Sequence, residues 1–241
     1  MTISLVHYNP DTGVSASITA TGGPSVGGYV NHSWRNLGTC ATQGLYTNPW
    51  YAEFAKQKLS EGLSASQIIE KIKTEDRNHA QRQCIIVDAD GEVACLDGEQ
   101  NIDYIGHIAG KQVGVAGNML ATPEVLNAFY NRFVKATTDN ADKVIENGEQ
   151  PSFVEGYENT LPHSLIEALE AALKSGGDKR GTYSASLRIE YPDKAPIDIR
   201  VDWSEDQVIQ DLRKVLSKVE GESFQSFLGG VPSNLQASNF P

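Results

Sequence analysis

Apolar and polar residues alternate from the second position of the chain, which is the pattern of a half-buried β-strand. TISLVHY and VSASITAT flank the turn-forming residues NPDTG, so residues 2–21 are predicted to form a β-hairpin. The stretch 20–33 is rich in Gly and Ser and is predicted to be a loop. A strand is expected over 35–43, and QCIIVDADGEVACLDG predicts a second hairpin around an Asp-Gly turn. GHIAGKQVGVAGNML is predicted to be further strand.

Helical periodicity with N-terminal capping residues alternates with these strands. Helices are expected over 48–62, 64–75, 122–136, 161–177 and 204–220, with Asn48, Ser64, Thr122 and Ser204 as the candidate caps. The polar stretch 138–160 is predicted to be loop or short helix, and YSASLRIEY and APIDIRVDW to be the last strands.

The order of these elements favours one α+β domain. Strands occur in hairpins rather than alternating singly with helices, which predicts mainly antiparallel sheets. No linker-like composition interrupts the chain, so residues 1–220 are assigned to one domain. Residues 221–241 show little periodicity and are predicted to be a tail or an arm that contacts another copy in a homo-oligomer.

Composition restricts the class of partner. The formal net charge of −11 and the sequence pI of about 4.9 argue against binding to a nucleic-acid backbone. No long apolar run and no basic, apolar leader is present, so neither membrane insertion nor secretion is expected. The three cysteines and five histidines have no metal-ligand spacing, and free thiols in a cytoplasmic protein without metal or cofactor are predicted.

Thr2 is a candidate nucleophile. Removal of Met1 is favoured before a small residue, and it would leave Thr2 with a free α-amine. Such an amine has a pKa near 7.7–8.0 in model peptides, so part of it is a free base at neutral pH and can activate the hydroxyl of the same residue. The alternative is a chance Met-Thr start. The strand that begins at once favours function, because it holds Thr2 within the fold.

The segment KSGGDKRGTYSASL, residues 174–187, combines glycines with a charge cluster of Asp178, Lys179 and Arg180. It is not a phosphate loop, because a helix precedes it and a strand follows it. It is either a helix C-terminus with complementary basic residues, or a loop whose Asp178 holds an α-ammonium group.

Other polar residues have two interpretations each. Asn118, after a strand, is either an oxyanion donor or a turn residue. His107 is a structural histidine or a catalytic base, and Gln43 and Asn48 are caps or substrate contacts. Cys40, within an expected strand, is a buried small residue or a nucleophile.

Five stretches together carry a resemblance to a known family. They are MTISLVHYNPDTG, ATQGLYTNPWY, QCIIVDADGEVACLDG, GHIAGKQVGVAGNML and GGDKRGTYSASL. In this combination the sequence resembles the uncharacterised Ntn-hydrolase-like family known as domain of unknown function 1028. The resemblance covers roughly nine tenths of the chain. It implies a four-layer αββα sandwich and a nucleophile at the position of Thr2.

The resemblance also has departures. The family pattern usually places Gln before the serine after GGDKRG, whereas this chain has Thr182-Tyr183-Ser184. The Ala-rich step after ATQ is replaced by Gly44-Leu45. Both changes alter the expected pocket, so no substrate is transferred from other family members.

The superfamily implied by this resemblance hydrolyses amide bonds, so by analogy we expect an N-terminal-nucleophile amidohydrolase acting on a small amide or peptide-like substrate. Thr2 attacks and supplies the base, Asn118 stabilises the oxyanion, and Asp178 and Lys179 orient the amine or lower its pKa. Supporting or substrate-binding roles are expected for Ser4, which shares a strand face with Thr2, and for Gln43, Asn48, His107, Arg180 and Ser184. The alternative is a non-catalytic small-ligand binding or assembly module on the same fold. A third hypothesis uses His107 as base and needs no free amine.

Overall fold

Strand β1 (Thr2–Tyr8) lies in the middle of a six-stranded antiparallel sheet. The computed structural model describes residues 2–232 of the chain. The order of the strands in this first sheet is β10-β9-β2-β1-β8-β7. Their bounds are β2 Ser15–Thr21, β7 Gly106–Ala109, β8 Val113–Asn118, β9 Ser184–Glu190 and β10 Ile197–Val201.

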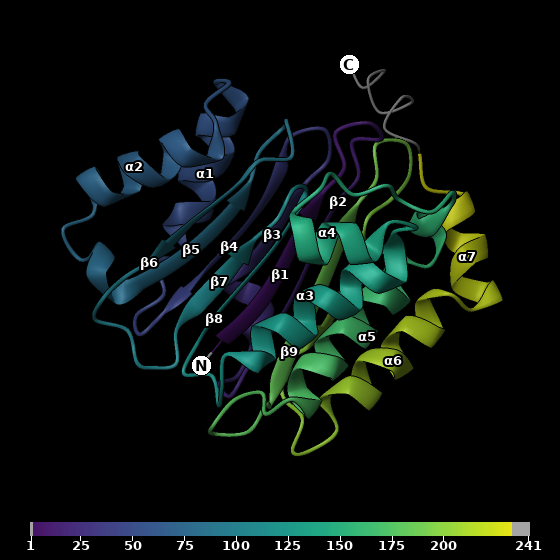
Figure 1. Ribbon diagram of the computed structural model, residues 1–241. Helices are drawn as coiled ribbons and strands as arrows, with labels where there is room; N and C mark the ends of the chain where they lie inside the picture. Colours follow the sequence, from purple (N-terminus) through teal and green to yellow (C-terminus); the bar gives the residue numbers. More distant parts are fainter. Residues whose placement is uncertain (1, 233–241) are drawn as a thin grey trace.

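A four-stranded antiparallel sheet of order β3-β4-β5-β6 faces the first sheet. Its strands are β3 Asn31–Trp34, β4 Gly38–Gly44, β5 Arg82–Val87 and β6 Val93–Asp97. Helices α1 (Trp50–Ser60) and α2 (Ala65–Glu75) cover its outer face. Figure 1 shows these two helices on one side of the paired sheets and the later helices on the other.

The outer face of the six-stranded sheet is covered by α3 (Glu124–Thr137), α5 (Leu161–Lys174) and α6 (Val208–Val219). Shorter elements complete the described chain: α4 Ala141–Asn147, α7 Glu222–Gly229, and the 3-10 turns η1 Val26–Gly28, η2 His79–Gln81 and η3 Tyr157–Asn159. The four layers and the antiparallel pairing confirm the predicted αββα sandwich.

Strand alternation produces the layers. On β1, Ile3 and Leu5 point into the apolar core shared with α3 and α5, whereas Ser4 points to the opposing sheet and bonds Gln43 on β4. A second apolar cluster fills the space beneath α1 and α2. Between the sheets, an apolar cluster that includes Val6 and Ile85 lies beside buried polar side chains such as Thr19 and Gln43.

Element boundaries differ from the sequence prediction in two places. The expected loop 20–33 contains η1 and the first half of β3, and the expected strand 35–43 is broken by a turn at 35–37, so it begins only at Gly38. Asn36 and Gly38 have positive φ angles of 58° and 144°, and this turn reverses the chain between β3 and β4. The Gly and Ser residues that precede this short strand predicted a loop instead.

Capping is confirmed for Ser64, which forms a full capping box with Gln67. Asn48 and Ser204 also accept a backbone hydrogen bond, but both lie before the residue that directly precedes their helix. Asn48 Oδ1 accepts from Trp50 N at 3.1 Å, and Ser204 Oγ accepts from Gln207 N at 3.2 Å.

The C-terminal part adds an element that the sequence pattern did not predict. Residues 222–229 form α7, with Phe224 and Phe227 exposed on it. Residues 233–241 lie outside the described residues. The division into a domain over 1–220 and an arm over 221–241, and self-association through that arm, stay predictions. Among residues 2–232, no helix combines the length and the apolar character needed to cross a bilayer.

His7 is fully buried on the helix-facing side of β1. Its Nδ1 lies 3.0 Å from the Gln112 carbonyl oxygen and its Nε2 lies 3.0 Å from the Tyr157 hydroxyl. The rings of Phe133, Phe153 and Tyr157 surround it at 5.1–5.8 Å between centroids. Burial lowers the pKa of His7 to about 4, although the bond to the Gln112 carbonyl opposes the shift. His7 is therefore neutral in the folded protein at neutral pH.

We expect the free energy of unfolding to fall as the pH is lowered from 6.5 towards 4. In that window the unfolded chain binds a proton at His7 and the folded chain does not, which costs about 2 kcal/mol between pH 7 and pH 5. Urea unfolding at both pH values measures this difference. His7→Gln should reduce the pH dependence, whereas His163→Gln, at an exposed histidine, should leave it intact. An unchanged pH dependence in His7→Gln would show that His7 does not cause it.

Candidate active site

A ladder of hydroxyl groups lies between the two sheets. Every second residue of β2 contributes one, namely Ser15, Ser17, Thr19 and Thr21, and all four are buried. Thr2 Oγ1 donates to Thr21 Oγ1 at 3.1 Å, and Ser4 and Thr19 hydroxyls lie 2.9 Å apart. These short side chains let the sheets approach closely and exchange hydrogen bonds across the gap.

Two glutamines connect this ladder to the opposing sheet. Gln43 on β4 accepts from Ser4 Oγ at 2.6 Å, and its Nε2 donates to the Thr2 carbonyl oxygen at 3.2 Å and to Gln83 Oε1 at 2.7 Å. Gln83 on β5 also accepts from Asn118 Nδ2 at 3.1 Å and donates to Asp97 Oδ1 at 2.7 Å. The backbone of Thr2 is therefore held by a side chain that is itself fully bonded.

Thr2 forms part of the wall of a small cavity of about 230 Å³. Its backbone belongs to a central strand, and only 8% of the residue is exposed. The cavity is otherwise lined by residues of three loops and strand ends: Thr21, Gly23, Pro24, Val26, Tyr29, Val30, Gly44, Leu45, Thr47, Met119 and Arg180. The lining combines hydroxyl groups, aliphatic side chains and one guanidinium group.

Asp178 organises the loop next to this cavity. Its carboxylate is buried, accepts from Gly22 N at 2.8 Å and from Arg180 N at 2.7 Å, and pairs with the Arg180 guanidinium at 3.2 Å. Gly22 is required for this approach, because a Cβ there would lie 2.6 Å from Asp178 Oδ2. Ser184 holds the facing loop, donating to the Gly23 carbonyl at 2.7 Å and accepting from Val26 N at 3.2 Å. Asp178 thus places Arg180 at the cavity.

Asn118 lies beside Thr2 in the register of β8 and β1. Residues opposite each other in an antiparallel pair have Cβ atoms about 4.5–5.5 Å apart, so the two side chains are neighbours. Asn118 is buried and in strand conformation; the left-handed residue is Met119, with φ 53°. A bulky residue in that conformation is strained, and Met119 lies on the cavity wall.

At the far end of the same network, His107 on β7 pairs with Asp97 on β6, Nδ1 to Oδ2, at 2.7 Å. The hydrogen bond to Asp97 raises the pKa of His107. Burial opposes ionisation of Asp97, but the bonds from His107 and Gln83 outweigh it and lower the pKa of this carboxyl. Cys95 Sγ lies 3.5 Å from Asp97 Oδ1, and burial followed by the nearby carboxylate raises the pKa of the thiol.

The structure brings Thr2, Ser4, Gln43 and Asn118 together, and Asp178, Arg180 and Ser184 form the adjacent loops. It does not bring the other three predicted residues to the cavity. Lys179 Nζ donates to the Asp103 carbonyl oxygen at 3.0 Å, and Asn48 begins α1 and lines a separate hollow beside Asp76. His107 reaches the site only through Asp97 and Gln83. Cys40 is fully buried in β4, as predicted for a small apolar residue.

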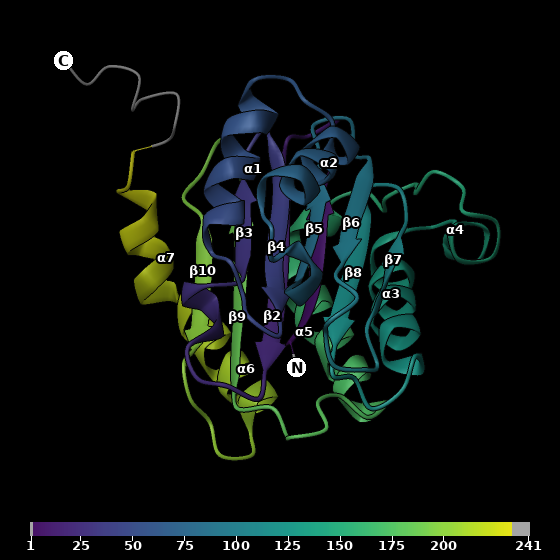
Figure 2. The same ribbon diagram turned by 90° about the vertical axis from the view of Figure 1, so that its left-hand side faces the viewer.

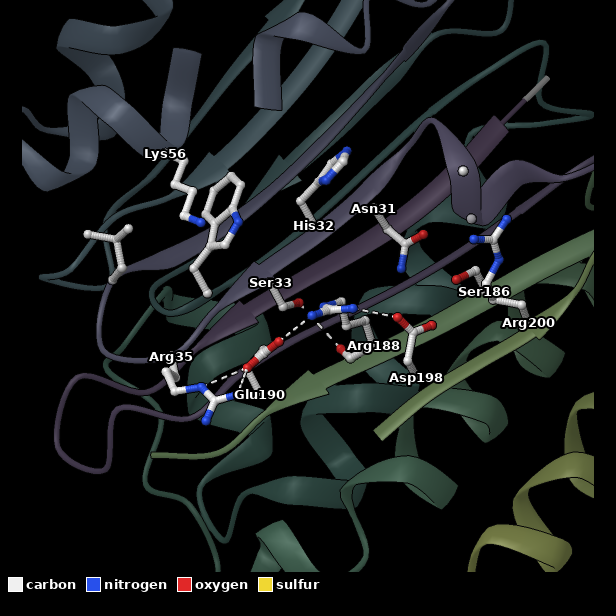
Figure 3. A pocket seen from close by; sticks show the side chains of 14 residues that line it. Asn31, His32, Ser33, Arg35, Lys56, Ser186, Arg188, Glu190, Asp198 and Arg200 are labelled. Carbon is white, nitrogen blue, oxygen red and sulfur yellow. Dashed lines mark hydrogen bonds and ion pairs between the residues drawn. The ribbon is translucent and has the colours of Figure 1, made fainter. Parts of the chain in front are cut away.

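A larger cavity of about 560 Å³ lies at the edge of the sandwich between β3 and the strands β9 and β10. Figure 3 shows Glu190 pairing with Arg35 and with Arg188, which in turn reaches Asp198. This chain of ion pairs ties the loop after β3 to β9 and β10, and Lys56 and Arg200 add further positive charge to the lining. The Thr2 cavity is smaller, but a candidate nucleophile and a guanidinium group line it, and Asn118 lies beside Thr2 on the neighbouring strand.

Three residues of the site were not singled out from the sequence. Thr21 and Gln83 bond candidate residues directly, and Asp97 connects His107 to Gln83. Alternation was the sequence signal that could have identified Gln83 and Thr21. Gln83 lies in the strand-like segment QCIIV, and Thr21 lies in the strand-like segment SASITAT. Alternation alone does not tell whether a polar face meets solvent or a second sheet.

Comparison with known proteins assigns the chain to a family. Residues 2–212 match the model described as "Family of unknown function (DUF1028)". The chain belongs to the DUF1028 family. A crystal structure of a DUF1028 protein from Silicibacter pomeroyi is similar to it, with a TM-score of 0.83 and 27% identity over 98% of this chain and 93% of that one. Both the family resemblance and the fold expected from the sequence are confirmed.

A second solved structure, Anbu (ancestral beta-subunit) from Yersinia bercovieri, matches with a TM-score of 0.38 and 9% identity, over 96% of this chain and 98% of that one. Similarity at this level carries no conclusion about function. No curated protein matches this DUF1028 chain.

We expect Asp178→Asn to destabilise the protein by about 1–3 kcal/mol, because a buried carboxylate that serves two N–H donors and a guanidinium would lose its charge and one acceptor. Denaturant unfolding measures the loss. Asp198→Asn is the matched control, since Asp198 also pairs with an arginine but is 40% exposed, and it should change stability by less than about 0.5 kcal/mol. Equal effects of the two substitutions would contradict the assigned role of Asp178.

Proposed function

We propose that this DUF1028 protein is an N-terminal-nucleophile hydrolase that cleaves a small amide or peptide-like substrate, with Thr2 as nucleophile after removal of Met1. The observation that carries the proposal is the position of Thr2: it begins a central strand, faces a cavity, and has its carbonyl oxygen bonded by Gln43. A reacting residue needs such a frame, because catalysis depends on holding the reacting atoms in one geometry.

In the proposed mechanism the Thr2 α-amine accepts the proton of Oγ1 as this oxygen attacks the substrate carbonyl carbon. The tetrahedral intermediate collapses to an ester on Thr2, and the amine returns the proton to the leaving nitrogen. A water molecule, deprotonated by the same amine, then hydrolyses the ester and restores the hydroxyl. Thr21, which accepts from Thr2 Oγ1 at 3.1 Å, favours one rotamer of the nucleophile.

Asn118 is the proposed oxyanion donor. One of its two amide N–H groups points to Gln83 Oε1 at 3.1 Å, which fixes the orientation of the amide beside Thr2. A donor fixed before reaction stabilises developing charge without a cost of reorganisation. The structure favours Arg180 over Lys179 as the cation of the site, because Arg180 lines the cavity.

The cavity sets the size of the substrate. A volume of about 230 Å³ is below the usual 300–1,000 Å³ of sites for drug-sized ligands. Aliphatic side chains of Val26, Leu45 and Met119 and the guanidinium of Arg180 face it. We therefore expect a short apolar acyl group, with any negative charge placed toward Arg180.

The test is acylation of the purified protein by a β-lactone, with peptide mapping by mass spectrometry, followed by turnover of a panel of small amides. The starting protein is first checked by intact mass for loss of Met1. We expect the label on Thr2 and a loss of turnover of about a thousandfold or more in Thr2→Ala. Thr2→Ser, which keeps a hydroxyl and an amine, should retain labelling.

A second variant separates the roles of the hydroxyl and the amine. A non-cleavable N-terminal extension keeps Oγ1 but removes the free α-amine, and loss of a general base should lower the rate about 10²–10⁴-fold. Thr12→Ala, at an exposed turn hydroxyl, is the control and should behave as the unmodified protein. Full labelling of Thr2→Ala, or full activity of the extended protein, would refute the mechanism. Ligand binding to Met-free protein without turnover of any amide would favour a binding module instead.

A further inference from the structure

Three side chains of types that commonly bind metals lie together at one edge of the sandwich. This edge is opposite the edge with the cavity lined by Arg35, Arg188 and Glu190. Strand β6 ends the four-stranded sheet and β7 ends the six-stranded sheet, and the two strands lie side by side (Figures 1 and 2). Cys95 and Asp97 are two residues apart on β6 and therefore share a face, and His107 on β7 faces them. A ligand atom from each of the three lies within 4.8 Å of the others.

The spacing of these atoms is close to that of a tetrahedral metal centre. Bonds of about 2.3 Å to sulfur and 2.0 Å to oxygen place two tetrahedral ligands about 3.5 Å apart. Cys95 Sγ and Asp97 Oδ1 are 3.5 Å apart. His107 Nδ1 lies 2.7 Å from Asp97 Oδ2, the other oxygen of the same carboxylate, so this hydrogen bond has to break and the ring has to shift before Nδ1 and Oδ1 can bind one metal ion. The side chain of His107 is 37% exposed, which allows this movement.

A neighbouring side chain forms the kind of supporting hydrogen bond that metal-binding residues usually have. Gln83 Nε2 donates to Asp97 Oδ1 at 2.7 Å and so fixes the carboxylate from behind. Gln83 is held in turn by Gln43 and Asn118. Carboxylates that bind metals are commonly oriented by such a second hydrogen bond, and an isolated surface acid has none.

We propose that Cys95, Asp97 and His107 form a binding site for one Zn²⁺ or Co²⁺ ion, with water as the fourth ligand. Thiolate, imidazole and carboxylate together favour these borderline ions over Mg²⁺ and Ca²⁺, which take oxygen ligands only. On binding, the Cys95 thiol releases its proton to solvent and His107 coordinates as neutral imidazole through Nδ1. Because its ligands come from both sheets, the ion joins β6 to β7.

The site is connected to the Thr2 cavity. Asp97 bonds Gln83, Gln83 bonds Gln43, and Gln43 bonds the Thr2 carbonyl oxygen. An ion at Asp97 therefore acts on the position of Thr2 through hydrogen bonds and touches no substrate in the proposed hydrolysis. Its presence is independent of whether Thr2 is a nucleophile, so the two proposals are tested separately.

The test is titration of the chelator-treated protein with Co²⁺, followed by absorbance. A tetrahedral site with a thiolate gives intense visible ligand-field bands and a near-ultraviolet sulfur-to-cobalt charge-transfer band. We expect both bands to saturate at one equivalent of Co²⁺ and to disappear when Zn²⁺ displaces it. Circular dichroism and thermal unfolding of each variant establish that it is folded.

The charge-transfer band should be absent in Cys95→Ser, which keeps the two buried thiols Cys40 and Cys84. Asp97→Asn and His107→Gln should weaken binding by at least about tenfold. His163→Gln is the matched control, because His163 also pairs with a carboxylate, Glu220 at 2.7 Å, and should bind Co²⁺ as the unmodified protein does. Absence of a charge-transfer band at excess Co²⁺, or its persistence in folded Cys95→Ser, would overturn the proposal.

Discussion

The facing surfaces of the two sheets carry hydroxyl and amide side chains. These side chains have to form hydrogen bonds within the protein, because an unpaired buried polar atom costs about 1–3 kcal/mol. In this protein the requirement is met most fully near Thr2, where the side chains of Ser4, Gln43 and Gln83 each take part in two or more hydrogen bonds. At the opposite end of the interlayer, Ser15 Oγ and Thr39 Oγ1 have no partner among the described residues. The relative position of the sheets therefore depends on the bonds around Gln43 and Gln83, and the geometry of the Thr2 cavity depends on that position.

This dependence explains why the candidate site occupies the end of the sandwich where β1 begins. Val6 and Ile85 belong to an apolar cluster that packs between the sheets beside the polar side chains. Near the start of β1, the bond from Gly22 N to the Asp178 carboxylate joins two loops, and their neighbouring residues Gly23 and Arg180 line the cavity. The outer apolar cores beneath α1 and α3 stabilise each sheet on the face away from the interlayer. Stability and site chemistry are thus assigned to different faces of the same strands.

The sequence predicts the order of elements well, because hairpins and capped helices leave local signals. It predicts Thr2, Ser4, Gln43 and Asn118 as one group only with the help of the family resemblance, since their proximity depends on sheet pairing between distant segments. It misses β3, because a strand of four residues that pairs with β4 across a three-residue turn is too short to show clear alternation. It also misses Gln83 and Asp97, since a polar residue within a strand pattern is expected to face solvent. Lys179 and Arg180 are adjacent in sequence, and only the fold decides which one faces the cavity.

The hydroxyl ladder also limits how the family can diverge. A substitution on the helix-facing side of β1 or β2, such as Val for Ile3 or Ile18, exchanges one apolar contact for another. A substitution on the ladder removes a donor or an acceptor from a partner on the neighbouring strand, so it is tolerated when that partner changes too. Ser4, Thr19 and Gln43 share bonds in this way across three strands. Related sequences should therefore show correlated changes at these positions, with the helix-facing positions varying independently of one another.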